Sequence, residues 1–130
     1  MSGENVERLR RAYEAFSRGD FDTALEIVHP EFEFVRAGGQ SRVTGAEAFR
    51  AWMEPDALED ARVEPLEFRT KGSKILVRAR TRARGAGSGM ELDNETWAVW
   101  TLDEDGLATH LGAFLGHQGD EALEAAGLRS

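Results

Sequence analysis

The strongest constraint in this sequence is a pair of short helices separated by one glycine near the N-terminus. Four apolar side chains recur at helical spacing in the first stretch, which places them on one helix face: Val6, Leu9, Tyr13 and Phe16. Gly19 then supplies a residue that readily adopts positive φ beyond a helix end, and Asp20 can cap the second helix. A second apolar stripe begins at Phe21 and ends before Pro30. The pattern predicts two helices that each pack one face against a common core.

Composition and charge exclude several classes of protein. A chain of 130 residues can bury a core without disulfides or metal ions, and with no cysteine it has no thiol chemistry or thiolate zinc site. The formal charge of −8 would repel phosphate backbones, so no nucleic-acid partner is expected. No apolar run reaches membrane-spanning length, and the N-terminal residues do not resemble a signal peptide. We therefore expect a cytoplasmic protein without a membrane partner, in which residues 1–130 form a single domain.

Beyond the first two helices, the chain consists mainly of strands and turns. A first strand is expected over residues 31–36, a loop over 37–42, and a helix opening at Thr44 with the Thr-x-x-Glu spacing of a capping box. A short closing helix is expected over residues 121–126. Four further strands, separated by glycine-containing turns, are expected over residues 62–71, 74–84, 90–102 and 107–115. Helices first and a meander of strands afterwards predict an α+β fold.

Four arginines at every second position share one face of the expected strand 74–84: Arg78, Arg80, Arg82 and Arg84. A symmetric hairpin with the next strand places these arginines opposite, respectively, Trp97, Glu95, Asp93 and Glu91. An anion-binding groove is the alternative, but three opposite-charge pairs and one cation–π contact favour a structural ladder. In this ladder Arg82 and Asp93 face each other.

The other face of the same strands carries a candidate small-molecule site. Alternation turns small and aromatic side chains inward, and the last hairpin is expected to place His110 beside Trp100. The predicted ligand-binding residues are Tyr13, Phe16, Phe34, Arg36, Trp52, Asn94, Thr96, Trp100 and Phe114. An aromatic surface with a few polar groups is typical of a pocket, although the same side chains could fill a solid core.

Arg36 and His110 carry the chemistry of this predicted site. A charged Arg36 on an inward face needs a partner or a ligand, which favours a cavity unless a salt bridge to Glu47 satisfies it. The expected partner is therefore a small, partly apolar molecule whose carboxylate or other anionic group faces Arg36. His110 is the candidate catalytic base, with an ordinary sheet histidine as the alternative. No metal or cofactor is expected, because the three histidines are scattered and no spacing places two ligands on one face.

The stretch from Tyr13 to Asp22 resembles the opening of the nuclear-transport-factor-2-like superfamily, in particular its SnoaL-like branch. The similarity continues through residues 97–102 to residues 121–128. It implies a curved, mostly antiparallel sheet wrapped around three N-terminal helices, a cone-shaped α+β barrel with an internal cavity. It also implies a homodimer joined through the outer sheet face, which is expected to expose Trp97, Val99, Leu111 and Leu115.

The catalytic residues that the resemblance implies have no counterpart in this chain. Polyketide-cyclase members place a His and an acid on the last two strands, and the positions that match here are Ala98 and Gly112. Steroid-isomerase members use a Tyr and two Asp, whose counterparts look like Ala12, Arg36 and Ala98. Two functions stay open: a small-molecule binding protein, or a cyclase, isomerase or hydrolase that uses His110 as a relocated base. The residues favour binding.

Overall fold

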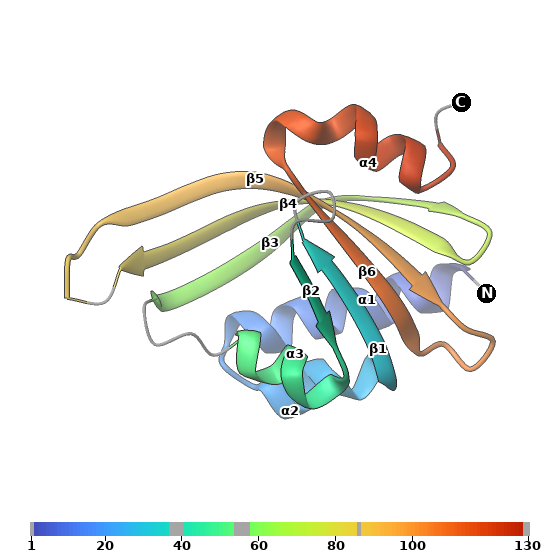
Figure 1. Ribbon diagram of the computed structural model, residues 1–130, viewed down its shortest axis with the longest axis horizontal. Coiled ribbons are helices and arrows are strands. Elements are labelled where there is room, and N and C mark those ends of the chain that lie inside the picture. Colours follow the sequence, from blue (N-terminus) through green and yellow to red (C-terminus); the bar gives the residue numbers. More distant parts are fainter. Residues whose placement is uncertain (1, 37–40, 54–57, 86, 129–130) are drawn as a thin grey trace.

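In the part of the chain that the structure describes, a six-stranded mixed sheet that does not close forms the centre, and four α-helices flank it (Figure 1). The computed structural model describes residues 2–36, 41–53, 58–85 and 87–128. The helices are α1 (Ser2–Ser17), α2 (Phe21–Ala24), α3 (Ala46–Met53) and α4 (Gly119–Ala125), with 3-10 turns η1 (Leu25–Ile27) and η2 (Gly116–Gln118). The strands are β1 (Val28–Arg36), β2 (Ser41–Thr44), β3 (Leu58–Lys71), β4 (Lys74–Gly85), β5 (Glu91–Leu102) and β6 (Ala108–Leu115), in the spatial order β2-β1-β6-β5-β4-β3.

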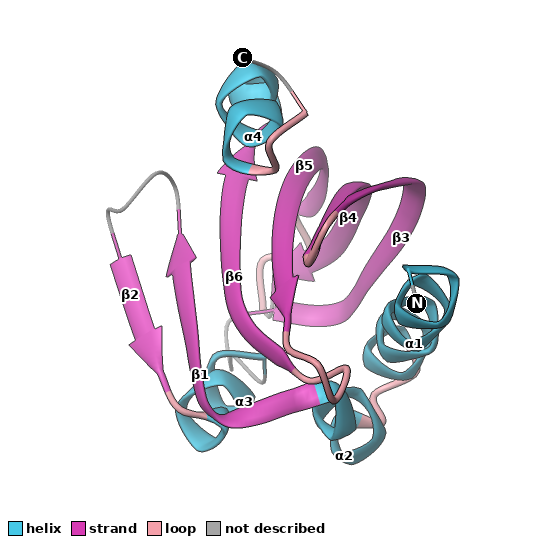
Figure 2. Ribbon diagram, turned by 90° about the vertical axis from the view of Figure 1, so that its right-hand side faces the viewer, coloured by secondary structure: helices cyan, strands magenta, loops and turns pink. Residues whose placement is uncertain are grey.

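The sheet curves around the N-terminal helices, as an α+β cone requires (Figure 2). Neighbouring strands are antiparallel except for β1 and β6, which are parallel. Helices α1, α2 and α3 lie on the concave inner face, and α4 lies on the convex outer face. The predicted fold class is confirmed. No helix in the described ranges is long and apolar enough to cross a membrane.

The boundary between the first two helices agrees with the sequence prediction. Gly19 has φ of +81°, a conformation that strains residues with a side chain. The Asp20 carboxylate accepts the Thr23 backbone N–H (3.2 Å) and the Thr23 hydroxyl (2.7 Å), which caps α2. The second helix is shorter than expected: it tightens into η1 after Ala24, and β1 begins at Val28. Val28 pairs with Ala108 of β6, so the chain from Val28 onward belongs to the sheet and not to the second helix.

One strand was missing from the sequence prediction. Residues 41 and 42, expected in a loop, belong to β2, which pairs antiparallel with β1 from Glu33 opposite Thr44 to Arg36 opposite Ser41. The rest of that expected loop, residues 37–40, lies outside the described residues. Because Thr44 ends this strand, it does not open the helix. The helix α3 starts at Ala46, and the Phe49 N–H donates to the Gly45 carbonyl (3.1 Å).

The arginine ladder has the predicted backbone register. Arg78, Arg80, Arg82 and Arg84 lie opposite Trp97, Glu95, Asp93 and Glu91, and the ladder occupies the outer face. The side chains, however, pair diagonally: the Arg80 guanidinium makes two bonds to Asp93 (2.8 and 2.6 Å), and Arg78 bonds Glu95 (2.8 Å). The arginine side chain is long enough for its guanidinium to reach the carboxylate that lies diagonally opposite on the neighbouring strand. The bonds from Arg80 also hold the pKa of Asp93 below its usual value.

A double-mutant cycle tests this diagonal geometry. We expect Arg80→Ala and Asp93→Ala to be non-additive in the free energy of unfolding, whereas Arg82→Ala and Asp93→Ala should couple less, because Arg80 makes both bonds. The coupling should shrink at raised salt, since both side chains are exposed. Urea unfolding of the variants measures it. Stronger coupling for Arg82 would show that the directly opposite pair is the one formed in solution.

The outer face is covered more than expected, which corrects the predicted dimer surface. Val99 is buried under α4 in an outer cluster with Leu76, Ala122 and Ala126. Leu111 instead belongs to the larger inner cluster of buried side chains between the sheet and the N-terminal helices. Lys74 donates from Nζ to the Ala125 carbonyl (2.9 Å) and thereby fixes the C-terminal end of α4. Leu115 shares the inward face of β6 with Leu111, so three of the four apolar side chains assigned to an exposed outer face are not available there.

Candidate functional site

The inner face of the sheet changes from filled to open along the strands. On β5 the inward residues Trp100, Ala98, Thr96 and Asn94 pass from buried through partly exposed to exposed. On β6 the neighbours Leu111, Ala113 and Leu115 follow the same gradient, and Leu115 is 49% exposed. Large side chains fill the inner face at Trp100, whereas alanines and threonines line it beyond that point. The exposed end of the inner face therefore lies toward the β4–β5 hairpin.

Tyr13 and Trp100 form the polar pair at the filled end. The Trp100 indole N–H donates to the Tyr13 hydroxyl oxygen (3.0 Å), and the two rings meet edge to face with centroids 6.1 Å apart. Burial raises the pKa of the Tyr13 hydroxyl well above its ordinary value, and the bond from Trp100 lowers it only in part. The phenol stays neutral, and its own proton remains free of the Trp100 bond.

Two hydroxyls and one amide lie farther along the inner face of β4 and β5. Thr81 on β4 and Thr96 on β5 place their hydroxyl oxygens 3.4 Å apart, and Asn94 lies opposite Thr81 in register. Both threonines are partly exposed, and Asn94 is exposed. These neutral groups can donate to or accept from a ligand oxygen without the desolvation cost of a charge.

Phenylalanines from β1 and α3 complete one wall. Phe32 stacks on Trp100 with centroids 6.2 Å apart, and Phe34 meets Phe49 edge to face at 5.3 Å. Phe16 of α1 is partly exposed and packs on Phe21 at 5.7 Å. The structure thus brings these predicted site residues to the inner face: Tyr13, Phe16, Phe34, Asn94, Thr96 and Trp100.

Two predicted ligand-binding side chains lie outside the described part of the structure. The backbone of Arg36 ends β1, and Trp52 lies in the last turn of α3, but the side chains of both fall outside it. The assignment of Arg36 as an anion-binding group stays a prediction.

His110 and Phe114 occupy the opposite face from the one predicted. A β-bulge shifts the register of β6 by one residue: Leu102 pairs with Ala108, but Thr101 pairs with His110, which leaves Thr109 as the extra residue. The shift places Leu111 rather than His110 beside Trp100 and turns His110, Gly112 and Phe114 to the outer face.

On the outer face, His110 is half-exposed and belongs to a small charged group. Its Nε2 lies 3.6 Å from the Glu33 carboxylate, which also lies 3.4 Å from the Arg42 guanidinium. Phe114 packs in the outer cluster with Trp97. The proposed role of His110 as an inward base therefore has no support from its position.

Sequence reasoning did not name Phe32 or Leu111 as site residues, although both lie beside Trp100. Phe32 lies two residues before Phe34, so strand alternation already indicated that it faces inward. No residue near position 109 in the sequence indicated the bulge that turns Leu111 inward. Among the inward positions of β4, β5 and β6 and of residues 62–71 of β3, none carries Asp, Glu or His. In the described ranges, no three such side chains gather to hold a metal ion.

Comparisons with known proteins agree with this geometry. The SnoaL-like domain family matches residues 9–111. TerC co-crystallised with polyporic acid has a TM-score of 0.75 at 22% identity, covering 92% of this chain and 98% of that chain. SalBIII, an epoxide hydrolase/cyclase-like enzyme in pyran ring formation in the polyether salinomycin, has a TM-score of 0.80 at 16% identity, covering 88% and 92%.

A Mycobacterium tuberculosis protein in complex with estradiol-17β-hemisuccinate has a TM-score of 0.74 at 13% identity, covering 85% of this chain and 92% of that chain. At these identities the solved structures show a shared fold. No curated protein matches the sequence significantly.

Proposed function

Because the chain belongs to the SnoaL-like domain family, we propose that it binds a small, partly apolar molecule on the inner face of its sheet. One observation carries the proposal: the inner face carries small, partly exposed side chains beyond Trp100, at Ala98, Ala113 and Thr96. A solid core would bury these central-strand positions under large side chains. Partial exposure at the centre of a sheet is what a cavity wall requires.

The polar groups of this face suit a ligand with oxygen atoms at both ends. Tyr13 has a neutral hydroxyl whose proton is not used by the bond from Trp100, so it can donate to a carbonyl or hydroxyl oxygen. Thr81 and Thr96 offer hydroxyls farther toward the opening. The apolar body of the molecule would lie beyond the buried Trp100, against Ala98 and Ala113.

We further propose that the ligand carries an anionic group that faces Arg36. Two structural neighbours were solved with an acid and with a steroid hemisuccinate, which supports a molecule that combines apolar and acidic parts. Arg36 would supply two parallel N–H donors to a carboxylate.

Estradiol-17β-hemisuccinate and its amide are a suitable pair of probes for this proposal. Calorimetry should show tighter binding of the carboxylate, and Arg36→Met should weaken its binding by about 1.5–3 kcal/mol, the usual contribution of a hydrogen bond to a charged group. The amide should bind the wild type and Arg36→Met alike.

Arg42→Met is the matched control, since Arg42 is an exposed arginine of β2 that pairs with Glu33 on the outer face. If neither probe binds, and a wider panel of cyclic carboxylates also fails, the binding function is wrong. If the probes bind but Arg36→Met has no effect, only the anionic part of the proposal is wrong.

The enzyme alternative needs a general base near the ligand. The inward positions of β4, β5 and β6 and of residues 62–71 of β3 supply hydroxyls and an amide but no carboxylate or imidazole. We therefore favour binding over proton abstraction as the function of this face.

A further inference from the structure

The β4–β5 hairpin extends past the end of β6 and leaves one edge of β5 unpaired (Figure 1). The last residue of β6, Leu115, lies opposite Thr96, so no described strand pairs with residues 91–95 on that side. All five of these residues are exposed. This edge presents backbone groups that another extended chain could pair with.

Hydrogen-bond alternation identifies which backbone groups face the free edge. The Gly85 N–H donates to the Met90 carbonyl (2.8 Å), so residue 90 directs its backbone groups toward β4. In an antiparallel ladder this direction alternates, and residues 92 and 94 then also face β4. Glu91 and Asp93 direct their N–H and C=O groups to the free edge, ready to pair with an added strand.

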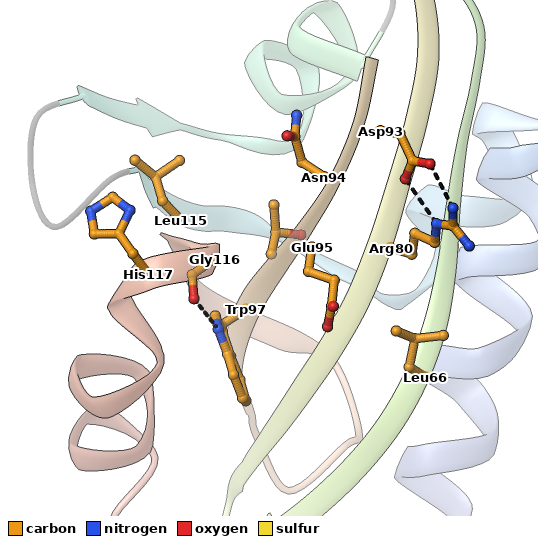
Figure 3. A pocket seen from close by; sticks show the side chains of 10 residues that line it. Leu66, Arg80, Asp93, Asn94, Glu95, Trp97, Leu115, Gly116 and His117 are labelled. Carbon is orange, nitrogen blue, oxygen red and sulfur yellow. Dashed lines mark hydrogen bonds and ion pairs between the residues drawn. The ribbon is translucent and has the colours of Figure 1, made fainter. Parts of the chain in front are cut away.

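A groove of about 970 Å³ lies against this edge (Figure 3). The groove is lined by consecutive β5 residues from Asp93 to Trp97 and, on the side of β6, by Leu115, Gly116 and His117. It also extends from the edge to Arg80 of β4 and Leu66 of β3. The edge of β5 itself is covered at Glu95, because a Cβ placed on Gly116 would come within 2.8 Å of the Glu95 carbonyl oxygen. Toward the hairpin tip no described strand pairs with this edge, so a segment laid there would take the place that β6 leaves.

The charges beside the edge specify the chemistry of the occupant. Glu91, Asp93 and Glu95 form the row nearest to an added strand. Arg80 and Arg78 of β4 bond Asp93 and Glu95, and the backbones of these arginines lie one strand farther away, about 4.8 Å. A second copy paired antiparallel about Asp93 would place Asp93 against itself and Glu91 against Glu95. Like charges directly opposite each other destabilise a sheet, and the chain as a whole carries −8.

We infer that the free edge of β5 binds an extended segment of a partner protein that carries Lys or Arg at every second position and apolar residues between them. The basic side chains would lie opposite the acidic row on the outer face. The apolar side chains would lie on the inner face beside Leu92 and Leu115, which are 38% and 49% exposed. The backbone bonds supply affinity and the alternation supplies specificity, as in other cases of strand addition.

A fluorescent heptapeptide of alternating valine and lysine, beginning and ending with valine, tests the inference by anisotropy with the full chain. We expect saturable binding, and binding at least about tenfold weaker for the same peptide with glutamates in place of lysines. A reordered peptide of identical composition, with its lysines adjacent, should also bind at least about tenfold weaker. Equal binding of all three peptides would overturn the inference, as would binding of none.

Two variants at one position separate backbone pairing from charge. Asp93→Pro removes an N–H that faces the free edge, not β4, and should weaken peptide binding by about tenfold. Asp93→Asn keeps the N–H and should weaken binding by about threefold. Equal loss in both variants would overturn strand addition.

Amide hydrogen exchange on the wild type gives a readout that does not depend on how well the variants fold. Peptide addition should slow exchange at Glu91 and Asp93, while residues 92 and 94, already bonded to β4, should change little. Protection confined to other segments would overturn the inference.

Sedimentation equilibrium without peptide tests the second copy as occupant. Self-association that slows exchange at Glu91 and Asp93 would identify another copy of the chain as the partner and overturn the inference. A homodimer that forms through the outer face would instead leave the amides of Glu91 and Asp93 free to exchange, and this result would agree with the inference. The peptide would reach the exposed end of the inner face, where Asn94 and Thr96 also lie. The peptide is followed through the edge amides and the small molecule through calorimetry, so failure of one proposal can be told apart from failure of the other.

Discussion

Tyr13→Phe should make the protein less stable at neutral pH and less sensitive to alkali. At neutral pH the variant leaves the buried Trp100 indole N–H without its acceptor, which should lower the free energy of unfolding by about 1–3 kcal/mol. Above about pH 10 the unfolded wild type loses the tyrosine proton while the folded state keeps it, because burial raises the folded-state pKa.

The sign of the pH effect depends on which state binds more protons. Above about pH 10 the folded wild type holds one proton more than the unfolded chain. Its stability should therefore fall by about 1.4 kcal/mol for each pH unit, until the folded-state pKa is reached. Tyr13→Phe lacks this loss, so the stability curves of the two proteins should converge as pH rises.

Urea unfolding between about pH 8 and about pH 11 measures both curves, and other basic groups contribute equally to each. The chain contains one tyrosine, so tyrosinate absorbance reports Tyr13 alone. In the folded protein the absorbance should stay low until the chain unfolds. A folded protein that titrates near pH 10 would show that the hydroxyl is solvated and that the Tyr13–Trp100 bond is not formed.

Ala98→Leu should strongly weaken ligand binding and leave the fold intact. Ala98 lies between Trp100 and Thr96 on the inner face and is partly exposed. If it lines a cavity, the leucine side chain enters empty space and changes the free energy of unfolding by less than about 0.5 kcal/mol. The same side chain would exclude the apolar body of estradiol-17β-hemisuccinate, and its affinity should fall by more than about tenfold.

The matched control is Ala108→Leu, the same substitution at a fully buried position in the inner cluster. Overpacking there should cost about 1–3 kcal/mol. Thermal unfolding and calorimetry of the two variants decide between a cavity and a solid core. A loss of stability at Ala98 as large as at Ala108 would mean that side chains fill the inner face.

Elements governed by local physics could be predicted from the residues. The break at Gly19 and the cap at Asp20 result from backbone freedom and from a side chain that reaches its own helix start. The β4–β5 register results from a short glycine-rich turn between two alternating strands, and every backbone pair of the ladder is as predicted. Period-two alternation likewise placed Thr96 and Trp100 on the inner face.

Elements set by pairing between distant segments could not be predicted in this way. The strand β2 exists because β1 offers an edge to it, and α4 covers Val99 because the outer face carries apolar side chains that need burial. The propensities of residues 41–44 and of the C-terminal segment do not contain that information.

The candidate site shows most clearly which features follow from the sequence and which follow from the tertiary structure. The sequence by itself determined which side chains alternate on β6, because a strand has a period of two residues. Only the tertiary structure decided which of the two sets faces inward. A single extra residue at Thr109 exchanges the faces, turning His110 out to Glu33 and bringing Leu111 in to Trp100. The bulge depends on how β6 fits between β5 and β1, and that fit is set by contacts across the sheet.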